Sequence, residues 1–435
     1  MWENWGGNQR CNPVRVLRPG STSEVARAVR EAARAGHRVR VAGSGHSFTG
    51  ACCTDGVMLV LDRLDQVLTV DVERRLVRVQ AGITLHALNE QLAVRGMALP
   101  NLGDVDVQTL GGALATGTHG TGVTLPNLSA QVAEVRLVDG RGEVRHLDAS
   151  TPDLLRAARV SIGAVGVVTE VTLQCVPAYV LRMVTRTQAT DQVLADLETM
   201  ADTHRHYELF AFPHTRVALV KATDVVDGPA RPRSGPRRWV DDVLLENHVL
   251  GLVCRLGRRR PGLVPRLNRA VTRMARPAIT IDQSHRALPT PRLVRFVEME
   301  YAVSRSAAPL LARTALRAAE MAGDAVNFPI ELRFSAGDDA LLSPAQGRDT
   351  AWVAVHAYRG MPHERFFKAV EETALALGGR PHWGKLHTLD AADLAERYPE
   401  WEAFQRARAM LDPDGVFGNE YIDRVLGPVG AMASP

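Results

Sequence analysis

The sequence predicts an α+β fold of two domains, and three observations carry this prediction. The chain has 435 residues, enough for two or three domains of ordinary size. Apolar residues make up 46% of it and charged residues 23%, the balance of a globular protein with a core. As far as Cys175, short helical and strand patterns alternate without the regularity of a parallel βαβ array. The pattern changes after Pro177, and we place a domain boundary there.

The elements of the first domain follow from local patterns. A hydroxyl cap with a glutamate three residues later, Ser21 to Glu24, begins a helix that should end near Gly36. Thr84 should cap a second helix, which ends near Gly96. Alternation of polar and apolar residues predicts strands, and one pair of them forms a β-hairpin around residues 139–142. The expected strands are 38–42, 57–61, 76–80, 132–138, 143–147 and 167–173.

The second domain should be a further mixture of helices and strands. Helical periodicity predicts helices over 191–203 and 307–322. Residues 227–236 are rich in Pro, Arg and Gly and should form a surface loop. Further strands are expected at 217–221, 296–302, 329–334 and 351–358.

The charged residues are unevenly distributed. The net charge is only +4, but arginines concentrate between Arg231 and Arg276, and no nucleic-acid-binding motif accompanies them. We therefore expect a solvated surface there and no nucleic-acid partner. Lysine is scarce and occurs only at positions 221, 368 and 385. The five cysteines are odd in number and scattered, which favours free, half-buried thiols over a disulfide framework or a zinc site.

The sequence gives no sign of a membrane segment. No apolar run approaches the ~20 residues of a membrane span. The first 20 residues lack the apolar stretch of a signal peptide. We therefore expect a soluble, cytoplasmic protein without a membrane span.

The strongest local signal is a glycine-rich loop at a predicted strand end, Val41-Ala-Gly-Ser-Gly-His-Ser-Phe48. Gly43 and Gly45 allow a tight turn that brings backbone N–H groups towards an anion. The loop is not the dinucleotide motif Gly-x-Gly-x-x-Gly, because Phe48 takes the sixth position. It therefore indicates phosphate binding of another kind.

Two further stretches offer backbone to a large ligand. Residues 103–122 contain six glycines and no aromatic residue, so a flat group can lie against the chain. Residues 161–168 add Gly163 and Gly166. A glycine-rich packing turn would also explain either stretch.

Two short motifs carry ionisable side chains. In Pro381-His-Trp-Gly-Lys385, the histidine and the lysine can face one site, as can His387. A third metal ligand at defined spacing is not apparent, so we predict no metal site. Glu331 and Arg333 are two apart on a predicted strand, so their side chains should be adjacent on one face, as an ion pair or as part of a site.

Together, in this order and spacing, these stretches resemble the aldonolactone and alditol oxidases of the vanillyl-alcohol-oxidase flavoprotein superfamily. The chain is most similar to actinobacterial sugar 1,4-lactone oxidoreductases of the gulonolactone and arabinonolactone type. The resemblance extends from Asn4 to about Leu426. The set that carries it is Ala42-Gly-Ser-Gly-His-Ser-Phe48, Ala115-Thr-Gly-Thr-His-Gly120, Glu331-x-Arg333 and His382-Trp-Gly-Lys385.

The resemblance implies a two-domain flavoprotein of vanillyl-alcohol-oxidase type. An FAD-binding domain of PCMH type would span residues 1–177 and a cap, or substrate, domain residues 178–380. Residues 381–435 would return to the FAD domain and the active site. His46 would be bonded covalently to the flavin 8α-methyl group. The residues implied to contact FAD are Val41, Ala42, Gly43, Ser44, Gly45, His46, Ser47, Gln108, Thr109, Gly112, Ala115, Thr116, Gly117, Thr118, His119, Gly163, Gly166, Val168 and His382.

The resemblance also implies the chemistry, which is oxidation of a hydroxyl of a sugar-derived lactone, such as gulono- or arabinono-1,4-lactone, by hydride transfer to flavin N5. Arg333 and Lys385 would flank the reacting oxygen, and Glu331 would bond a neighbouring hydroxyl. His356 would line the pocket. Glu331 is the only acidic pocket candidate that we identify in the cap, which favours a small, neutral, polyhydroxylated substrate over an amine. Either O2 or another acceptor would reoxidise the flavin.

Other functions fit parts of the pattern. The same residues would suit an alditol oxidase, or an oxidase that modifies a secondary metabolite. A nicotinamide-dependent dehydrogenase would need the Gly-x-Gly-x-x-Gly motif, which is absent from the sequence. A flavin-binding protein without enzymatic activity would be expected to lack Glu331, Arg333 or Lys385.

Overall fold

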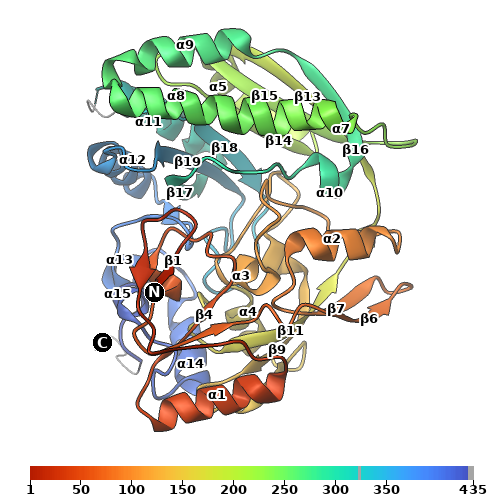
Figure 1. Cartoon of the computed structure of the whole chain (residues 1–435), viewed down its shortest axis with the longest axis vertical. Coiled ribbons are helices and arrows are strands. Elements are labelled where there is room, and N and C mark those ends of the chain that lie inside the picture. Colours follow the sequence, from red (N-terminus) through yellow and green to blue (C-terminus); the bar gives the residue numbers. More distant parts are fainter. Residues whose placement is uncertain (322–324, 430–435) are drawn as a thin grey trace.

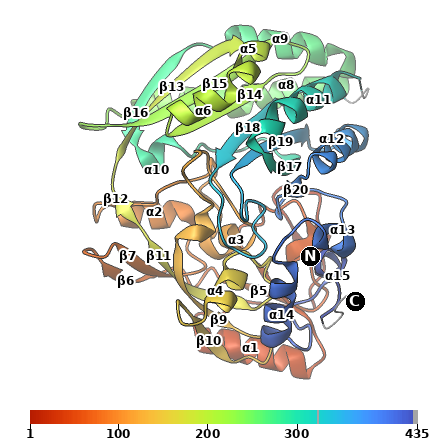
Figure 2. The ribbon, with the colours of Figure 1, turned by 180° about the vertical axis from the view of Figure 1, so that it is seen from behind.

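The computed structural model describes residues 1–321 and 325–429. Two halves lie one above the other (Figures 1 and 2). The half at the bottom of Figure 1 contains the N-terminal elements and the last helices of the chain, and the half at the top contains one large sheet with helices over it. The chain is thus a mixture of helices and mostly antiparallel sheets, and the predicted α+β class is confirmed.

The lower half begins with a small parallel sheet of order β3-β5-β4. Helix α1 covers it and starts as predicted, with the Ser21 hydroxyl accepting a hydrogen bond from the Glu24 amide. The apolar stripe of α1 is buried against the sheet together with Phe417 from the far end of the chain. The bounds are α1 Thr22–Arg34, β3 Arg15–Leu17, β4 Val39–Ala42 and β5 Val57–Val60.

A five-stranded antiparallel sheet of order β10-β9-β11-β7-β6 completes the lower half. The predicted hairpin is confirmed, with Val138 opposite Val144. Short helices pack on this sheet, and Thr84 caps α2 as expected. The bounds are β6 Val67–Asp71, β7 Leu76–Gln80, α2 Leu85–Ala93, α3 Leu110–Ala115, β9 Val132–Val138, β10 Val144–Leu147, α4 Pro152–Arg159 and β11 Val167–Gln174.

The upper half is built on an eight-stranded sheet of order β16-β13-β15-β14-β18-β19-β17-β20. Helices α5, α6, α11 and α12 bury apolar side chains against one face. Successive side chains of a strand point to opposite faces, so the other face carries the intervening residues. The strand bounds are β13 Val180–Ala189, β14 His206–Ala211, β15 Val217–Val226, β16 Ala278–Gln283, β17 Phe296–Ser304, β18 Ile330–Ser335, β19 Thr350–Tyr358 and β20 Arg380–Pro381.

Two expectations for this half were wrong or incomplete. The helix expected over 191–203 is two short helices, α5 (Thr190–Ala195) and α6 (Leu197–Thr203), with Asp196 between them. The arginine-rich stretch after residue 234 is largely helical, because buried positions such as Gly251, Cys254 and Gly257 recur at helical spacing between exposed arginines. Its elements are α7 Gly235–Arg238, η3 Trp239–Val249, α8 Leu250–Arg259 and α9 Val264–Met274.

The end of the chain returns to the lower half. Strand β20 pairs with β17 in the upper sheet, and the following helices then pack in the lower core. The buried Arg40 side chain of β4 donates hydrogen bonds to the carbonyl oxygens of Ala51, Ile162, Gly163 and Phe417. It therefore joins three segments that are distant in sequence. The remaining helices are α11 Ala308–Met321, α12 Glu364–Ala376, α13 Ala391–Ala395, α14 Trp401–Leu411 and α15 Glu420–Leu426.

None of the helices within the described residues is long and apolar enough to cross a bilayer.

Candidate active site

The glycine-rich loop after β4 presents free backbone donors. Gly45 adopts φ +69°, a left-handed conformation that favours glycine. The amides of residues 44–47 donate to no protein acceptor within the described part of the chain, and the loop is only partly covered. Consecutive free N–H groups in a turn of this kind form an anion-binding concavity. The geometry therefore supports the predicted phosphate role.

The other glycine-rich stretches lie beside this loop. Ser44 Oγ donates to Val107 O at 2.5 Å. A Cβ placed on Gly43 would lie 2.2 Å from Thr109 Oγ1, so the two segments need a glycine there. The Ile162 amide donates to Ala115 O at 2.9 Å, which brings the 161–163 turn against the end of α3.

The residues expected to contact FAD differ in exposure. Gly166 is buried and faces Leu137 and Val138, so the structure places it in close packing rather than at an open surface. Ala42, Gly117, Thr118, His119 and His382 are buried as well. The partly or fully exposed ones are Val41, Gly43, Ser44, Gly45, His46, Ser47, Gln108, Thr109, Gly112, Ala115, Thr116, Gly163 and Val168.

His46 and Lys385 come together although they are distant in sequence. The Phe48 amide donates to Gly384 O at 2.7 Å, and the Lys385 ammonium lies 5.4 Å from the centre of the Phe48 ring. The His46 ring stacks on Trp5, with ring centres 5.3 Å apart. Burial lowers the pKa of His46, and the nearby Lys385 charge lowers it further, against a hydrogen bond to Ser44 O. The imidazole is therefore held neutral and nucleophilic.

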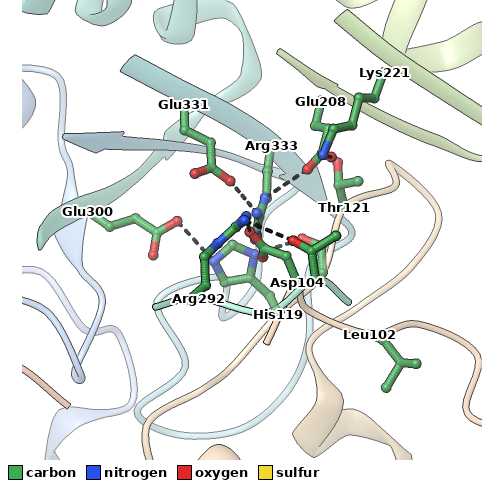
Figure 3. Close-up of polar contacts among 12 residues, drawn as sticks. Leu102, Asp104, His119, Thr121, Glu208, Lys221, Arg292, Glu300, Glu331 and Arg333 are labelled. Carbon is green, nitrogen blue, oxygen red and sulfur yellow. Dashed lines mark hydrogen bonds and ion pairs between the residues drawn. The ribbon is translucent and has the colours of Figure 1, made fainter. Parts of the chain in front are cut away.

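A cluster of buried charges covers the face of the upper sheet that looks towards the lower half (Figure 3). Glu331 and Arg333 lie in direct contact on β18, as the spacing predicted. Arg333 also pairs with Asp104 at 2.5 Å and with Glu208 at 3.2 Å. Asp104 follows Gly103 in the lower half and also binds Arg292 at 2.8 Å. The guanidinium of Arg333 is thus fixed by three acidic side chains from three segments.

The surroundings shift the pKa values of Asp104 and Glu331 in opposite directions. Burial opposes the ionisation of Asp104, but the charges of Arg333 and Arg292 outweigh it and hold the pKa of Asp104 well below its usual range. For Glu331, burial and the neighbouring carboxylates outweigh Arg333 and raise the pKa to about 8. Glu331 is therefore largely protonated at neutral pH, and its hydroxyl can donate a hydrogen bond.

Lys385 has its own carboxylate partner. It forms an ion pair with Glu298 on β17. Burial would lower the pKa of Lys385, but Glu298 and Glu300 reverse this and raise it. His356 Nε2 lies 3.6 Å from Glu298 Oε1 and 3.8 Å from Glu331 Oε2, so it bridges the two halves of the cluster. The expected position of His356 in the pocket is consistent with these contacts.

A second network joins His119 to the sheet. His119 Nδ1 lies 2.8 Å from Gly120 O, and its Nε2 lies 3.2 Å from Glu300 Oε1. Both ring nitrogens therefore face hydrogen-bond acceptors. The ring stacks on Trp352 with centres 3.8 Å apart. His119 is thus held by a carboxylate on one side and an indole on the other.

His382 brings a third potential metal ligand to this network. The ligand atoms of His119, Glu300 and His382 lie within 4.8 Å of one another, a set that the sequence did not reveal. However, His119 already uses both nitrogens, and His382 Nδ1 accepts from the Gly384 amide at 3.0 Å. The Lys385 charge also acts on His382 and Glu300. We therefore interpret the set as a hydrogen-bonded network.

Two sequence expectations for the site were wrong. The cap is not low in acidic residues, because Glu208, Glu298 and Glu300 accompany Glu331 at the site. The available signal was alternation, because Glu298 and Glu300 lie two residues apart on the strand predicted over 296–302. Glu208 lies on β14, which neighbours β18. His387 does not face the site but hydrogen-bonds the Tyr421 hydroxyl at 3.1 Å in the lower core.

Comparisons with known proteins agree with this geometry. The profile of an FAD-binding domain matches residues 13–148. The fold is similar to that of cholesterol oxidase from Brevibacterium sterolicum, with a TM-score of 0.81 and 20% identity over 98% of this chain and 96% of that one. The FAD-binding profile, together with the family and the relatives reported next, defines an FAD-dependent oxidoreductase that acts on CH–OH groups.

The family follows from the second half of the chain and from whole-length relatives. The profile of D-arabinono-1,4-lactone oxidase matches residues 171–425, and the chain belongs to this family. It is 46% identical to L-gulono-1,4-lactone dehydrogenase from Mycobacterium tuberculosis, over 98% of this chain and 99% of that protein. It is 32% identical to L-gulonolactone oxidase from Bos taurus, over 98% of both.

Proposed function

We propose that this protein oxidises a hydroxyl group of an aldono-1,4-lactone, such as gulono- or arabinono-1,4-lactone, with FAD bonded covalently to His46. The observation that carries the proposal is that His46, on the glycine-rich loop, lies near Lys385. Lys385 in turn belongs to the charged cluster of Glu331 and Arg333 on the upper sheet. The relatives named above supply the substrate class.

FAD fits the residues of the lower half. The free amides of residues 44–47 suit a pyrophosphate. Gly112 is exposed and Gly163 is partly exposed, so the backbone at both is accessible to a large ligand. His46 keeps Nε2 available, since Nδ1 lies 3.2 Å from Ser44 O. When bound, FAD supplies the hydride acceptor, flavin N5.

The charged cluster would position and polarise the substrate. Protonated Glu331 donates a hydrogen bond to a hydroxyl or ring oxygen. Three acidic side chains hold the Arg333 guanidinium in one position, so its remaining edge presents a fixed positive charge. Lys385 stabilises the oxygen that loses its proton. We assign acceptance of that proton to Glu298, which contacts Lys385 directly.

The cluster also bears on the choice of substrate. Five buried or half-buried carboxyl groups, Asp104, Glu208, Glu298, Glu300 and Glu331, are balanced by the cations Arg292, Arg333, Lys221 and Lys385 and by the proton on Glu331. A neutral substrate leaves this balance intact, whereas a charged one would disturb it. The site therefore favours a neutral lactone. An alditol remains the second candidate, since the same groups would bind its hydroxyls.

The first test is the covalent bond. The purified protein is precipitated with acid, and the visible spectra of pellet and supernatant are recorded. We expect the flavin colour in the pellet for the wild type and in the supernatant, or absent, for His46→Ala. His37→Ala is the matched control, because His37 is exposed after α1.

The outcomes test the His46 bond, the substrate class and FAD binding separately. Colour in the wild-type supernatant would mean FAD without the His46 bond. A coloured, folded protein that reduces its flavin with xylitol but not with L-gulono-1,4-lactone would replace the lactone by an alditol. A folded protein without flavin would overturn the proposal.

A further inference from the structure

The first residues of the chain lie between the glycine-rich loop and the upper half, and the proposed reaction assigns them no part. Strands β1 (Trp2–Glu3) and β2 (Arg10–Cys11) pair as a small antiparallel hairpin. We call residues 2–11 the N-terminal strap. Glu3 forms an ion pair at 3.3 Å with Arg359, which follows β19 of the upper sheet. The strap is therefore tied to the upper half while it packs on the loop of the lower half.

The strap binds the carbonyl side of the glycine-rich loop. The Trp5 amide donates to Gly45 O at 2.8 Å, and the Asn4 side-chain amide donates to Ser47 O at 2.9 Å. Asn4 is 2% exposed, and its side-chain oxygen accepts hydrogen bonds from two amides of the strap itself. In a trans peptide the carbonyl and the following N–H point in opposite directions. By holding the Gly45 carbonyl, the strap therefore turns the His46 amide to the opposite side, where it is free for an anion.

The Trp5 ring lies flat against the His46 imidazole. The ring centres are 5.3 Å apart and the ring planes differ by 16°. Trp5 also meets Phe48 and Phe296 edge-on, with centres 6.3 Å and 5.2 Å apart. Phe296 begins β17 of the upper sheet, so the indole is packed between the loop and the upper half. An indole fixed in this way restricts the plane of the imidazole that stacks on it.

The stack and one hydrogen bond leave a single nitrogen of His46 for chemistry. Nδ1 lies 3.2 Å from Ser44 O and can donate its proton there. Nε2 has no hydrogen-bond partner in the part of the chain that the structure describes. The stack on Trp5 sets the plane of the ring, and the bond to Ser44 sets its rotation within that plane. Together they fix the direction of the Nε2 lone pair.

We propose that the N-terminal strap presents His46 to the flavin, with Trp5 as the positioning residue that holds the imidazole for bond formation. This inference rests on the covalent FAD proposed above. The new bond joins His46 Nε2 to the flavin 8α carbon, where one C–H bond is broken, and the imidazole gives up its Nδ1 proton. Two electrons and two protons are released in total, and dioxygen takes them up as hydrogen peroxide. A ring that is oriented in advance reaches the reactive geometry more often, which raises the rate of this step.

The rate of bond formation in the full-length chain tests the proposal. The protein is produced without flavin in riboflavin-starved cells, and excess FAD is added under air. Samples are precipitated with acid over time, and the flavin in the pellet gives the rate. Flavin retained after desalting, before acid, gives total binding. We expect Trp5→Ala to slow bond formation roughly two- to tenfold, the range of aromatic pair energies, with total binding unchanged.

Two further changes at Trp5 separate positioning from packing. Trp5→Phe keeps a flat ring against His46 and should recover most of the wild-type rate. Trp5→Leu fills much of the same space without a ring and should be as slow as Trp5→Ala. Each variant is first checked for a wild-type thermal transition.

The matched control is Trp2→Ala, a change of the same residue type in the same strap. The Trp2 ring lies against the backbone of Gly45, where an added Cβ would be 3.3 Å from it. Among the described residues, the ring that stacks on His46 is that of Trp5, so Trp2→Ala should stay close to the wild-type rate.

The outcomes distinguish this inference from the covalent bond itself. A wild-type rate in Trp5→Ala, an equal loss in Trp2→Ala, or no recovery in Trp5→Phe would overturn the role of Trp5 and leave the His46 bond standing. A wild type without acid-stable flavin would overturn the His46 bond and this inference with it.

Discussion

At the scale of single residues, the site depends on one carboxyl group that stays protonated. Glu331 lies between Arg333 and His356, yet burial and the surrounding carboxylates raise its pKa to about 8. Its ordinary pKa is 4.5. Because the folded value is higher, the protonated form contributes stability that is fully present below pH 4.5. That contribution is lost as the pH rises towards 8.

The raised pKa of Glu331 also predicts how activity depends on pH. In the wild type, kcat/KM for L-gulono-1,4-lactone should fall above about pH 8, by roughly tenfold per pH unit, as Glu331 loses its proton. Glu331→Gln keeps a hydrogen-bond donor and should remove this inflection. Its thermal stability, relative to the wild type, should rise from pH 5 to pH 8. A variant that retains the wild-type inflection would show that another group titrates.

The pair of His119 and Glu300 gives a second prediction at this scale. Glu300→Gln would leave His119 Nε2 facing a neutral amide in place of a buried carboxylate, and the loss of a buried hydrogen bond to a charged group costs about 1–3 kcal/mol. The free energy of unfolding should therefore fall by this order, as chemical denaturation measures it. Glu372→Gln, an exposed change on α12, should leave it unchanged.

At the scale of elements, the contact between the glycine-rich loop and α3 sets the shape of the expected cofactor site. Gly43→Ala would place a Cβ 2.2 Å from Thr109 Oγ1, and overpacking of this kind costs about 1–3 kcal/mol. We expect lower stability and less retained flavin. Thr109→Ala removes the clashing oxygen, since the next atom is the Thr109 Cβ at 3.4 Å. The double variant should recover most of both properties.

A double variant as impaired as Gly43→Ala would contradict this reading of the contact. Flavin content per folded protein and the midpoint of thermal unfolding are the two measurements.

Elements that have strong local signals could be predicted from the sequence. The cap at Ser21 and the period-2 pattern of residues 132–147 depend on neighbours in sequence, so helix α1 and the β9–β10 hairpin were expected. The helices after residue 234 were missed, because exposed arginines and leucines on their outer face hid the helical pattern of buried positions. Glu298 and Glu300 were missed because their partners, Lys385 and His119, are reached only through the fold.

At the scale of the whole molecule, Arg40 holds the lower half together. Its guanidinium satisfies four carbonyl oxygens from three segments, and although burial lowers its pKa to about 10, it stays charged at neutral pH. Arg40→Met would leave these acceptors buried without donors, at a cost on the order of 3 kcal/mol or more. Hydrogen exchange should quicken around Phe417 and Ile162. Arg27→Met, exposed on α1, should leave exchange at both places unchanged.

The contact of the Arg40 side chain with Phe417, which is distant in sequence, also bears on the order of events during protein synthesis. Arg40 is translated 377 residues before Phe417, and Phe48 is translated well before Gly384, to which its amide binds. While the ribosome is still making the upper half, the glycine-rich loop has emerged but lacks the segment that closes behind it. Flavin should therefore be retained only once the segments around Gly384 and Phe417 have been made. A chain that stops prematurely anywhere in the upper half is expected to purify without flavin colour.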